Sequence, residues 1–460
     1  MTNDPLIPNN LPAKRVAAGF DTPEALAVAV DIDPDWYALM ESGRVLPTHP
    51  ELDRLTAALG GIKGSDIYNL GSLNLIAGQR NNEDGYTPAK MYRMLADECH
   101  VLMSRDEITW FDRDPGTGHR ADVAVNMSCG PARNPNLLQD TVAVLNALGV
   151  NFIAVSGSAA CCGKPYTNVD QPEAAERVNK AHADRSAAWG ATVHVNWCVA
   201  CQMTSTVAAE RRFRRDGVEH PLREVQLLTF VAERIRELGD RVPWRRPVNT
   251  RVLAVGHSDL FGPAHLEAHD ATERLLRLVP GVEVVGRLDA HADDSPCTFQ
   301  GREKDWTPPA WFATQDTPEG VRAHRERLAD TVNSLGADTA CLSHQYCHVL
   351  WLPYSSDRLS IRHPISIVAE ALGCVHPDRR LAAIRLGDPS AFVEQTRDLW
   401  QSWGISEDRA LELATSLSSP TFVDPGTQCR CDGGGGGGCR ESLVSVDVLS
   451  ATARATPATA

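Results

Sequence analysis

The spacing of hydrophobic residues divides this chain into a helical N-terminal part and a longer α/β part. Within residues 1–75, apolar residues recur at helical spacing in short segments that end at Gly19, Gly43 and Gly60. From residue 121 onward, short apolar runs alternate with longer amphipathic stretches, as in parallel strands joined by covering helices. The pattern therefore predicts a set of short helices followed by βαβ units.

Three apolar runs in the α/β part each precede cysteines. The runs span residues 121–127, 151–155 and 192–197, and we predict parallel strands there, with helices between them. In an open parallel sheet, ligand sites form beyond the carboxyl ends of the strands, which meet at one edge. We therefore expect five thiols at that edge: Cys129 after the first run, Cys161 and Cys162 after the second, and Cys198 and Cys201 after the third.

Composition is that of a multidomain globular protein. Its 460 residues exceed one ordinary domain, and 43% of them are hydrophobic. A net charge of −14 argues against a large basic surface for nucleic acid. The sequence has no run of about 18 apolar residues, and its first residues lack the basic and apolar regions of a signal peptide. We therefore expect a cytoplasmic protein with no membrane partner, whose 13 cysteines stay reduced.

The number and pairing of the five thiols favour a metal centre. Soft thiolates suit either an iron–sulfur cluster or zinc. Zinc usually takes four ligands in a closed tetrahedron, and five cysteines with an adjacent pair exceed that need. An iron–sulfur centre is the leading interpretation, with zinc and a metal-free arrangement as the alternatives.

The cysteine spacing also resembles that of a known family. The pattern Cys-x31-Cys-Cys-Gly-x34-Cys-x2-Cys is similar to the CCG (cysteine-rich) domain of heterodisulfide reductases and related iron–sulfur oxidoreductases. The resemblance implies a Rossmann-like α/β fold and a noncubane [4Fe–4S] cluster, on which that family cleaves disulfide substrates. Carried over position by position, the cluster ligands are Cys129, Cys161, Cys162, Cys198 and Cys201.

A second, degenerate copy of this domain is predicted downstream. At the positions corresponding to the first copy's cysteines stand His257, Cys297, His344 and Cys347, with Cys341 nearby. Three interpretations stay open: a relict pocket, a separate metal site with mixed Cys/His ligation, and a pocket for substrate or effector. Loss of the cysteine pair argues against a second noncubane cluster.

The N-terminal helices resemble a DNA-binding module. Residues 22–27 are Thr-Pro-Glu-Ala-Leu-Ala and residues 41–44 are Glu-Ser-Gly-Arg, an order similar to the helix-turn-helix of the Xre/Cro phage-repressor family. The resemblance implies DNA contacts from Asp35, Trp36, Tyr37 and Arg44. However, residues 1–70 hold five basic and ten acidic side chains, and phosphate neutralisation supplies most of the affinity for DNA. A docking or dimerisation module is the alternative.

We accordingly predict a multidomain protein, with an all-α helix-turn-helix domain followed by a tandem α/β domain of CCG type. Its segments are a helix-turn-helix domain (1–75), a connector helix (76–120), the intact CCG domain (121–247), the degenerate repeat (248–375) and a C-terminal part (376–460). Within the connector, Cys99 lies on an apolar stripe and is predicted to be buried packing. The C-terminal part has two predicted helices, over residues 389–403 and 407–417, and a glycine-rich loop with Cys429, Cys431 and Cys439.

Two functions from different classes follow from these features. The leading hypothesis is a homodimeric transcriptional regulator that binds DNA and senses redox state, a thiol or disulfide, or another small ligand at the cluster. The rival is a heterodisulfide-reductase-like oxidoreductase. Since the sequence has no ferredoxin-type Cys-x2-Cys-x2-Cys-x3-Cys run, that enzyme needs a separate electron-donor subunit.

Overall fold

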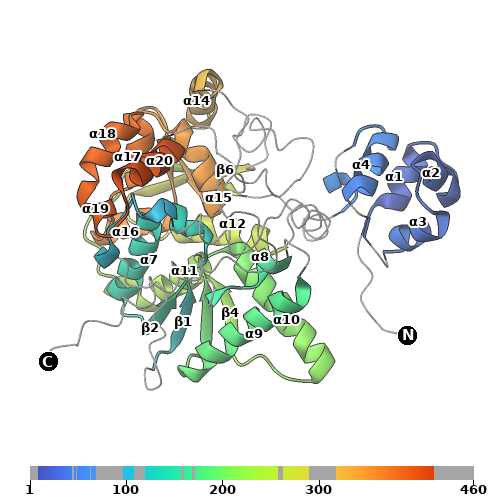
Figure 1. Cartoon of the computed structure of the whole chain (residues 1–460). Helices are drawn as coiled ribbons and strands as arrows, with labels where there is room; N and C mark the ends of the chain where they lie inside the picture. The colour runs from blue at the N-terminus through green and yellow to red at the C-terminus, as the bar shows by residue number, and fades with distance from the viewer. Residues whose placement is uncertain are drawn as a thin grey trace.

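The chain folds into a group of N-terminal helices and an α/β part built on two parallel sheets (Figure 1). This computed structural model describes residues 9–43, 46–47, 49–62, 64–68, 97–107, 120–156, 160–167, 171–256, 263–289 and 318–418. The predicted α/β class is confirmed. Across these ranges, no helix has both the length and the apolar character needed to cross a membrane.

Four short helices make up the N-terminal group. They are α1 (Leu11–Ala17), α2 (Pro23–Ala29), α3 (Pro34–Glu41) and α4 (His49–Ala58). Thr22 and Asp33 cap α2 and α3, because each side chain accepts a hydrogen bond from a backbone N–H of the first turn, at 3.2 and 3.0 Å. The helices bury a hydrophobic core of their own, which includes Leu26 and Met40. Their identity as a helix-turn-helix domain stays a prediction.

The first sheet carries the cysteine motif. Its strands are β1 (Val123–Asn126), β2 (Phe152–Val155), β3 (Val193–Asn196) and β4 (Arg223–Gln226), in the order β2-β1-β3-β4 and all parallel. The connecting helices are α7 (Pro135–Ala147), α9 (Pro172–Ala188), α10 (Val199–Asp216) and, after β4, α11 (Leu227–Leu238). Asn126 of β1 pairs with both Val155 and Asn196, so three strands end level with one another. The loops that hold the cysteines therefore leave the sheet at one edge.

The second sheet has the same strand order. Its strands are β5 (Thr250–Gly256), β6 (Val282–Asp289), β7 (Thr339–Leu342) and β8 (Ser360–Arg362), in the order β6-β5-β7-β8 and all parallel. The helices of this unit are α12 (Pro263–Leu276), α14 (Pro318–Ser334), α15 (Gln345–Trp351) and α16 (Pro364–Leu372). The two units therefore have one topology, while the exact domain limits stay predictions.

One hydrophobic core joins the two units. It combines residues such as Val125 and Leu137 from the first unit with Val252 and Ile365 from the second. Helix α7 packs against α16, as the ribbons show (Figure 1). Between these helices the buried carboxylate of Asp140 accepts hydrogen bonds from the hydroxyl of Ser366, at 2.6 Å, and the backbone N–H of His376, at 2.7 Å. The two sheets are consequently parts of one packed body.

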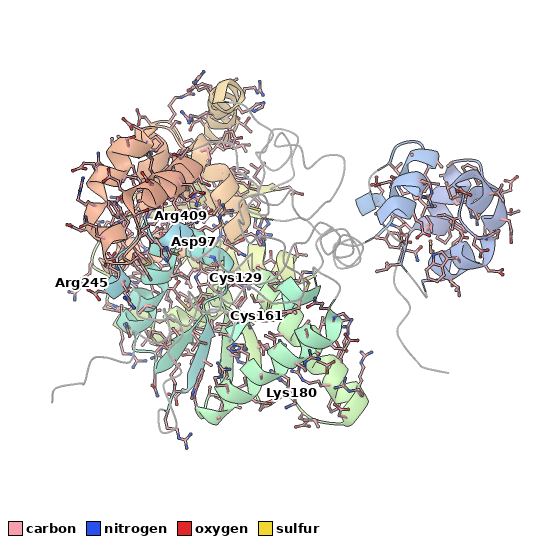
Figure 2. All side chains as sticks on the ribbon, viewed as in Figure 1. Asp97, Cys129, Cys161, Lys180, Arg245 and Arg409 are labelled. Carbon is pink, nitrogen blue, oxygen red and sulfur yellow. The ribbon has the colours of Figure 1, made fainter. Side chains whose placement is uncertain are left out.

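C-terminal helices cover the segment that precedes the first sheet. They are α17 (Arg379–Leu386), α18 (Pro389–Gln395), α19 (Arg397–Gln401) and α20 (Glu407–Ser418). The predicted helix over residues 389–403 is wrong in detail, because the backbone leaves the helical region at Thr396 and divides it into α18 and α19. Val101 and Leu102 pack into the core of these helices. Asp97 and Arg409, labelled in Figure 2, form an ion pair at 2.6 Å.

A buried ion cluster also joins this preceding segment to the cysteine motif. Glu98 accepts two hydrogen bonds from Arg133, at 2.6 and 2.7 Å, and one from Arg380, at 3.0 Å. Burial opposes ionisation of Glu98, but the charges of the two guanidinium groups lower its pKa below the ordinary value. Next to it, buried Cys99 donates from its thiol to the carbonyl of Ala132, at 2.8 Å. Cys99 is therefore a packing residue, as predicted.

Candidate metal centre

The structure brings the five predicted ligands together at the carboxyl edge of the first sheet. Cys129 precedes a short 3-10 helix, η3 (Gly130–Arg133), and Cys161 and Cys162 precede the short helix α8 (Lys164–Thr167). Cys198 is the N-cap of α10 and Cys201 lies in its first turn. Figure 2 labels Cys129 and Cys161 near the middle of the α/β part. None of the five forms a disulfide.

Most of this thiol group is sealed from solvent. Cys161, Cys162, Cys198 and Cys201 are 5%, 4%, 3% and 4% exposed, and Cys129 is half-buried. Burial raises the pKa of the Cys129 thiol to about 12. Because bare thiolates are costly in such surroundings, this edge requires positive charge or a metal to hold sulfur in its anionic form.

Hydrogen bonds between the thiols distribute their protons unevenly. The thiols of Cys161 and Cys201 both donate to Cys162, which lowers the pKa of Cys162 well below its usual value. Cys201 also donates to Cys198 and thereby lowers the pKa of Cys198. The pKa of Cys201, as the donor in both bonds, is raised well above the usual value. Two sulfurs of the group are thus predisposed to the thiolate form that metals bind.

Several donors outside the thiol group are directed at sulfur. The backbone N–H of Gly163 donates to Cys161 at 3.2 Å, and the side-chain amide of Gln345 donates to Cys198 at 3.0 Å. The hydroxyl of Ser128 lies 3.3 Å from the sulfur of Cys201. Lys164 adds a positive charge near Cys162, although burial lowers the pKa of this lysine to about 8. These groups therefore favour negative charge on the sulfurs of Cys161, Cys162 and Cys198.

Two unusual backbone positions shape the loops that hold the cysteines. Gly163 has a φ of +95°, and a Cβ there would lie 2.5 Å from the carbonyl oxygen of Ala175, so only glycine fits after the cysteine pair. Ser128 has a φ of 62° immediately before Cys129. Its backbone N–H donates to the Asn126 side chain at 2.9 Å, and its carbonyl accepts from Ser156 at 2.8 Å. These bonds hold a conformation that is uncommon for serine.

The donor set fits an iron–sulfur group better than a single ion. Iron–sulfur clusters are held by cysteine thiolates and tuned by hydrogen bonds to the sulfurs. Five cysteines with N–H donors directed at two of their sulfurs match that requirement, and they exceed the four ligands of a closed zinc site.

The predicted second site is described only in part. His257 and Cys297 lie outside the described residues, as do Cys429, Cys431 and Cys439. His344 is the N-cap of α15, and its Nδ1 atom is 3.7 Å from the sulfur of Cys347. Cys341 lies within β7 and is fully buried, which raises its pKa, so it belongs to the core rather than to the sheet edge. The second site stays a prediction.

One of the predicted DNA contacts is wrong on the geometry of α3. Tyr37 is fully buried in the core of the N-terminal helices, because it lies one helical turn before buried Met40 on the inner face. Its ring is therefore not available to a base edge. Asp35 is exposed and Trp36 is 38% exposed, while Arg44 lies outside the described residues.

Two of the basic residues in this helical group support its fold. Arg15 is 8% exposed and pairs with Glu41 at 2.8 Å, and it also donates to the carbonyl of Phe20. Arg54 donates to the carbonyl of Val30 at 2.7 Å. Because these guanidinium groups bind the protein itself, they contribute less to phosphate binding than the sequence suggests.

Sequence reasoning missed a buried polar network beside the cysteines. His194 on β3 hydrogen-bonds His182 at 2.9 Å and Glu224 at 2.9 Å, and Asn196 donates to Glu224 at 2.5 Å. Burial opposes ionisation of Glu224, yet the charge and hydrogen bond of His194 and a hydrogen bond from His220 lower its pKa to about 2. Polar residues at two positions of an otherwise apolar strand were the available signal.

Comparison with known proteins agrees with the class of this site. A family model described as a cysteine-rich domain, CCG, matches residues 123–205, which include all five cysteines. The matched region is less than half of the chain. A search of curated proteins finds no match. The match supports an iron–sulfur or redox-related function for the first α/β unit.

Proposed function

We propose that the five cysteines hold a noncubane [4Fe–4S] cluster and that the chain is an iron–sulfur-dependent transcriptional regulator. The observation that carries this proposal is the group of five thiols, four of them sealed from solvent, with N–H donors directed at its sulfurs. When bound, the cluster supplies a reversible one-electron change and iron sites that small ligands can reach. The chain's own thiolates, Cys162 and Cys198 foremost, hold it.

Burial of the thiols favours detection over turnover. Four of the five sulfurs are at most 5% exposed, so a bulky disulfide has little access to them. Electron transfer and reaction with small oxidants do not require a bulky molecule to reach the sulfurs. Cys129 is only half-buried, so a small thiol or disulfide effector approaches the site at this residue.

A short route connects the site to the segment that leads toward the N-terminal helices. Cys129 is the N-cap of η3, and Arg133 at the end of η3 binds Glu98. A displacement of Cys129 would therefore move Arg133 and its buried ion pair with Glu98. Through residues 97–107, that change alters the relative placement of two N-terminal helical groups in a homodimer, and hence DNA binding.

The second candidate function is a heterodisulfide-reductase-like oxidoreductase with a separate electron-donor subunit. It is favoured by the N-terminal helices, in which acidic residues dominate, Tyr37 is buried and Arg15 pairs with Glu41. In that case the N-terminal group docks the partner subunit instead of DNA.

An anaerobic gel-shift against the DNA upstream of the protein's own gene separates the two functions. The protein is reconstituted with iron and sulfide and assayed reduced, oxidised and without cluster, with Cys162→Ser protein as the matched control. We expect retardation that depends on the state of the cluster and is absent in the control. No retardation in any state, together with turnover of a disulfide by an artificial reductant, would overturn the regulator in favour of the enzyme.

A further inference from the structure

A residue of the second unit reaches the cysteine site of the first. Gln345 is the first residue of α15 and is 2% exposed. Its Nε2 atom donates to the sulfur of Cys198 at 3.0 Å, across 147 residues of sequence.

Close packing fixes the position of this glutamine. A Cβ added to Gly130 would lie 2.7 Å from Cγ of Gln345 and 2.8 Å from its Nε2 atom. Gly130 directly follows Cys129, so the side chain of Gln345 lies against the loop of one cysteine while it bonds to another. Glycine at position 130 is what allows this close approach.

The orientation of the amide is set by the sulfur. Among the described residues, the Oε1 atom of Gln345 is buried and has no hydrogen-bond partner. A flipped amide would place this oxygen against the electron-rich sulfur of Cys198, which is unfavourable. The site therefore retains one unsatisfied carbonyl oxygen in order to keep an N–H donor on the sulfur.

Corresponding positions in the two units explain why the donor comes from the second. Cys198 and His344 are the N-caps of α10 and α15, and each helix begins directly after the third strand of its unit. The residue after the N-cap is Val199 in the first unit and Gln345 in the second. Valine cannot donate a hydrogen bond from its side chain. The second unit thus supplies a hydrogen-bond donor at the position where the first has an apolar side chain.

We propose that Gln345 is a positioning residue that raises the reduction potential of the cluster bound through Cys198. This inference rests on the proposed cluster. In the step concerned, one electron passes from a one-electron reductant to the cluster, and no bond to Cys198 breaks. Negative charge on the sulfur grows on reduction, so an N–H···S bond stabilises the reduced state more than the oxidised state.

The test is an anaerobic redox titration of the full-length reconstituted protein, followed by electron paramagnetic resonance. Gln345→Met keeps the side-chain length without a donor, and Gln345→Glu replaces the donor with a charge. We expect the equilibrium constant for one-electron reduction to fall by about tenfold in the Met variant, or about 59 mV, and further in the Glu variant. Gln395→Met, at the exposed end of α18, is the control and leaves the potential unchanged.

The failure of this inference differs from the failure of the proposed cluster. An unchanged potential and spectrum in Gln345→Met protein with wild-type iron content would overturn the role of Gln345 alone. Wild-type protein that takes up no iron and sulfide would overturn the cluster itself. Should Gln345→Met not fold, Gln345→Asn carries the same measurement, because it keeps the amide but is one methylene too short for the bond.

Discussion

The two α/β units share a backbone plan but differ in the chemistry at the sheet edge. In each unit a helix starts soon after the third strand, and the N-cap residues have similar backbone angles: φ −99° and ψ 137° at Cys198, φ −100° and ψ 121° at His344. Three residues later each helix carries a cysteine, Cys201 or Cys347. The N-cap geometry is thus nearly the same for cysteine and for histidine, so the backbone at this position does not require a cysteine.

Side chains of the second unit's edge turn instead toward the first unit. The ring of His363, the N-cap of α16, stacks on Trp197 with centroids 4.6 Å apart and planes 19° from parallel. Trp197 directly precedes Cys198. His363 and Gln345 thus bring side chains of the second unit against the cysteine site of the first. The second unit therefore supports that site structurally, whether or not it binds a ligand of its own.

The largest expected difference between the units is in iron binding. Cys162→Ser should lower the iron and sulfide content of reconstituted protein by about tenfold or more, because even the loss of an outer hydrogen-bond partner costs a metal site about 10- to 100-fold in affinity. Cys347→Ser should leave the content and the visible spectrum unchanged. The measurement is iron and sulfide analysis with absorbance spectroscopy. Equal losses in both variants would mean that the units share one cluster.

The next largest effect is expected on the free energy of unfolding, at the ion cluster that joins the first unit to its flanking segments. Glu98→Gln removes the negative charge that offsets two buried guanidinium groups, those of Arg133 and Arg380, and should lower the free energy of unfolding by about 3–5 kcal/mol. Denaturant unfolding measures this. Asp97→Asn, which breaks a more exposed ion pair with Arg409, is the control and should cost about 1 kcal/mol or less. A small effect at Glu98 would contradict the tight coupling of the connector to η3.

One glycine in each unit should differ in its tolerance of a side chain: Gly163 of the first unit is crowded at a positive φ, and Gly286 of the second is not. Gly163→Ala places a methyl group 2.5 Å from the Ala175 carbonyl at a positive φ, and should destabilise the protein by about 2 kcal/mol or more. Gly286→Ala in β6 meets only Leu253 at 3.5 Å and should change stability by less than about 1 kcal/mol. Thermal unfolding of both variants tests the contrast, and similar melting temperatures would refute it.

The smallest effect expected per group is the pH dependence from one buried histidine in each unit. Burial lowers the pKa of His182 in the first unit well below its usual value, and that of His348 in the second to about 3. Unfolded histidine has a pKa of about 6.5, so below that pH the unfolded chain binds protons that the folded chain does not. Stability should be complete above about pH 6.5 and fall by about 1.4 kcal/mol per pH unit for each such histidine.

Denaturant unfolding between pH 7 and pH 5 measures how the free energy of unfolding changes with pH. His182→Leu and His348→Leu should each reduce this slope by the contribution of one histidine, if both units unfold together. A reduced slope in only one variant would show that the two units unfold separately.

Much of the α/β part was predictable because its strands are short, apolar and buried. The runs before Cys129, Cys161 and Cys198 are strands in the structure, and their level ends follow from parallel pairing. The break at Thr396 was not predictable, because apolar spacing continues through it and only the local backbone reveals the two helices.

The meeting of the five cysteines at one sheet edge was predictable, but their surroundings were not. Cysteines at strand ends give a strong signal, whereas Gln345 reaches Cys198 only through tertiary packing and lies 147 residues away. Tyr37 was misplaced because the resemblance to a repressor assigns a helix to DNA without showing which face of that helix is buried. The strand-end positions of the cysteines are thus local information, whereas the contacts around them and the accessible faces of helices depend on the whole fold.

The hydrogen bonds of Asp140 with Ser366 and His376 limit how far the cysteine site can be separated from the rest of the chain. A gene fragment that encodes residues 121–247 alone would expose the face of α7 that packs against α16 and leave this carboxylate without its two partners. The stretch matched by the family model is accordingly not a portable module. Transplanting the site into another scaffold would require both sheets, and the second sheet cannot be discarded even if it never binds a metal.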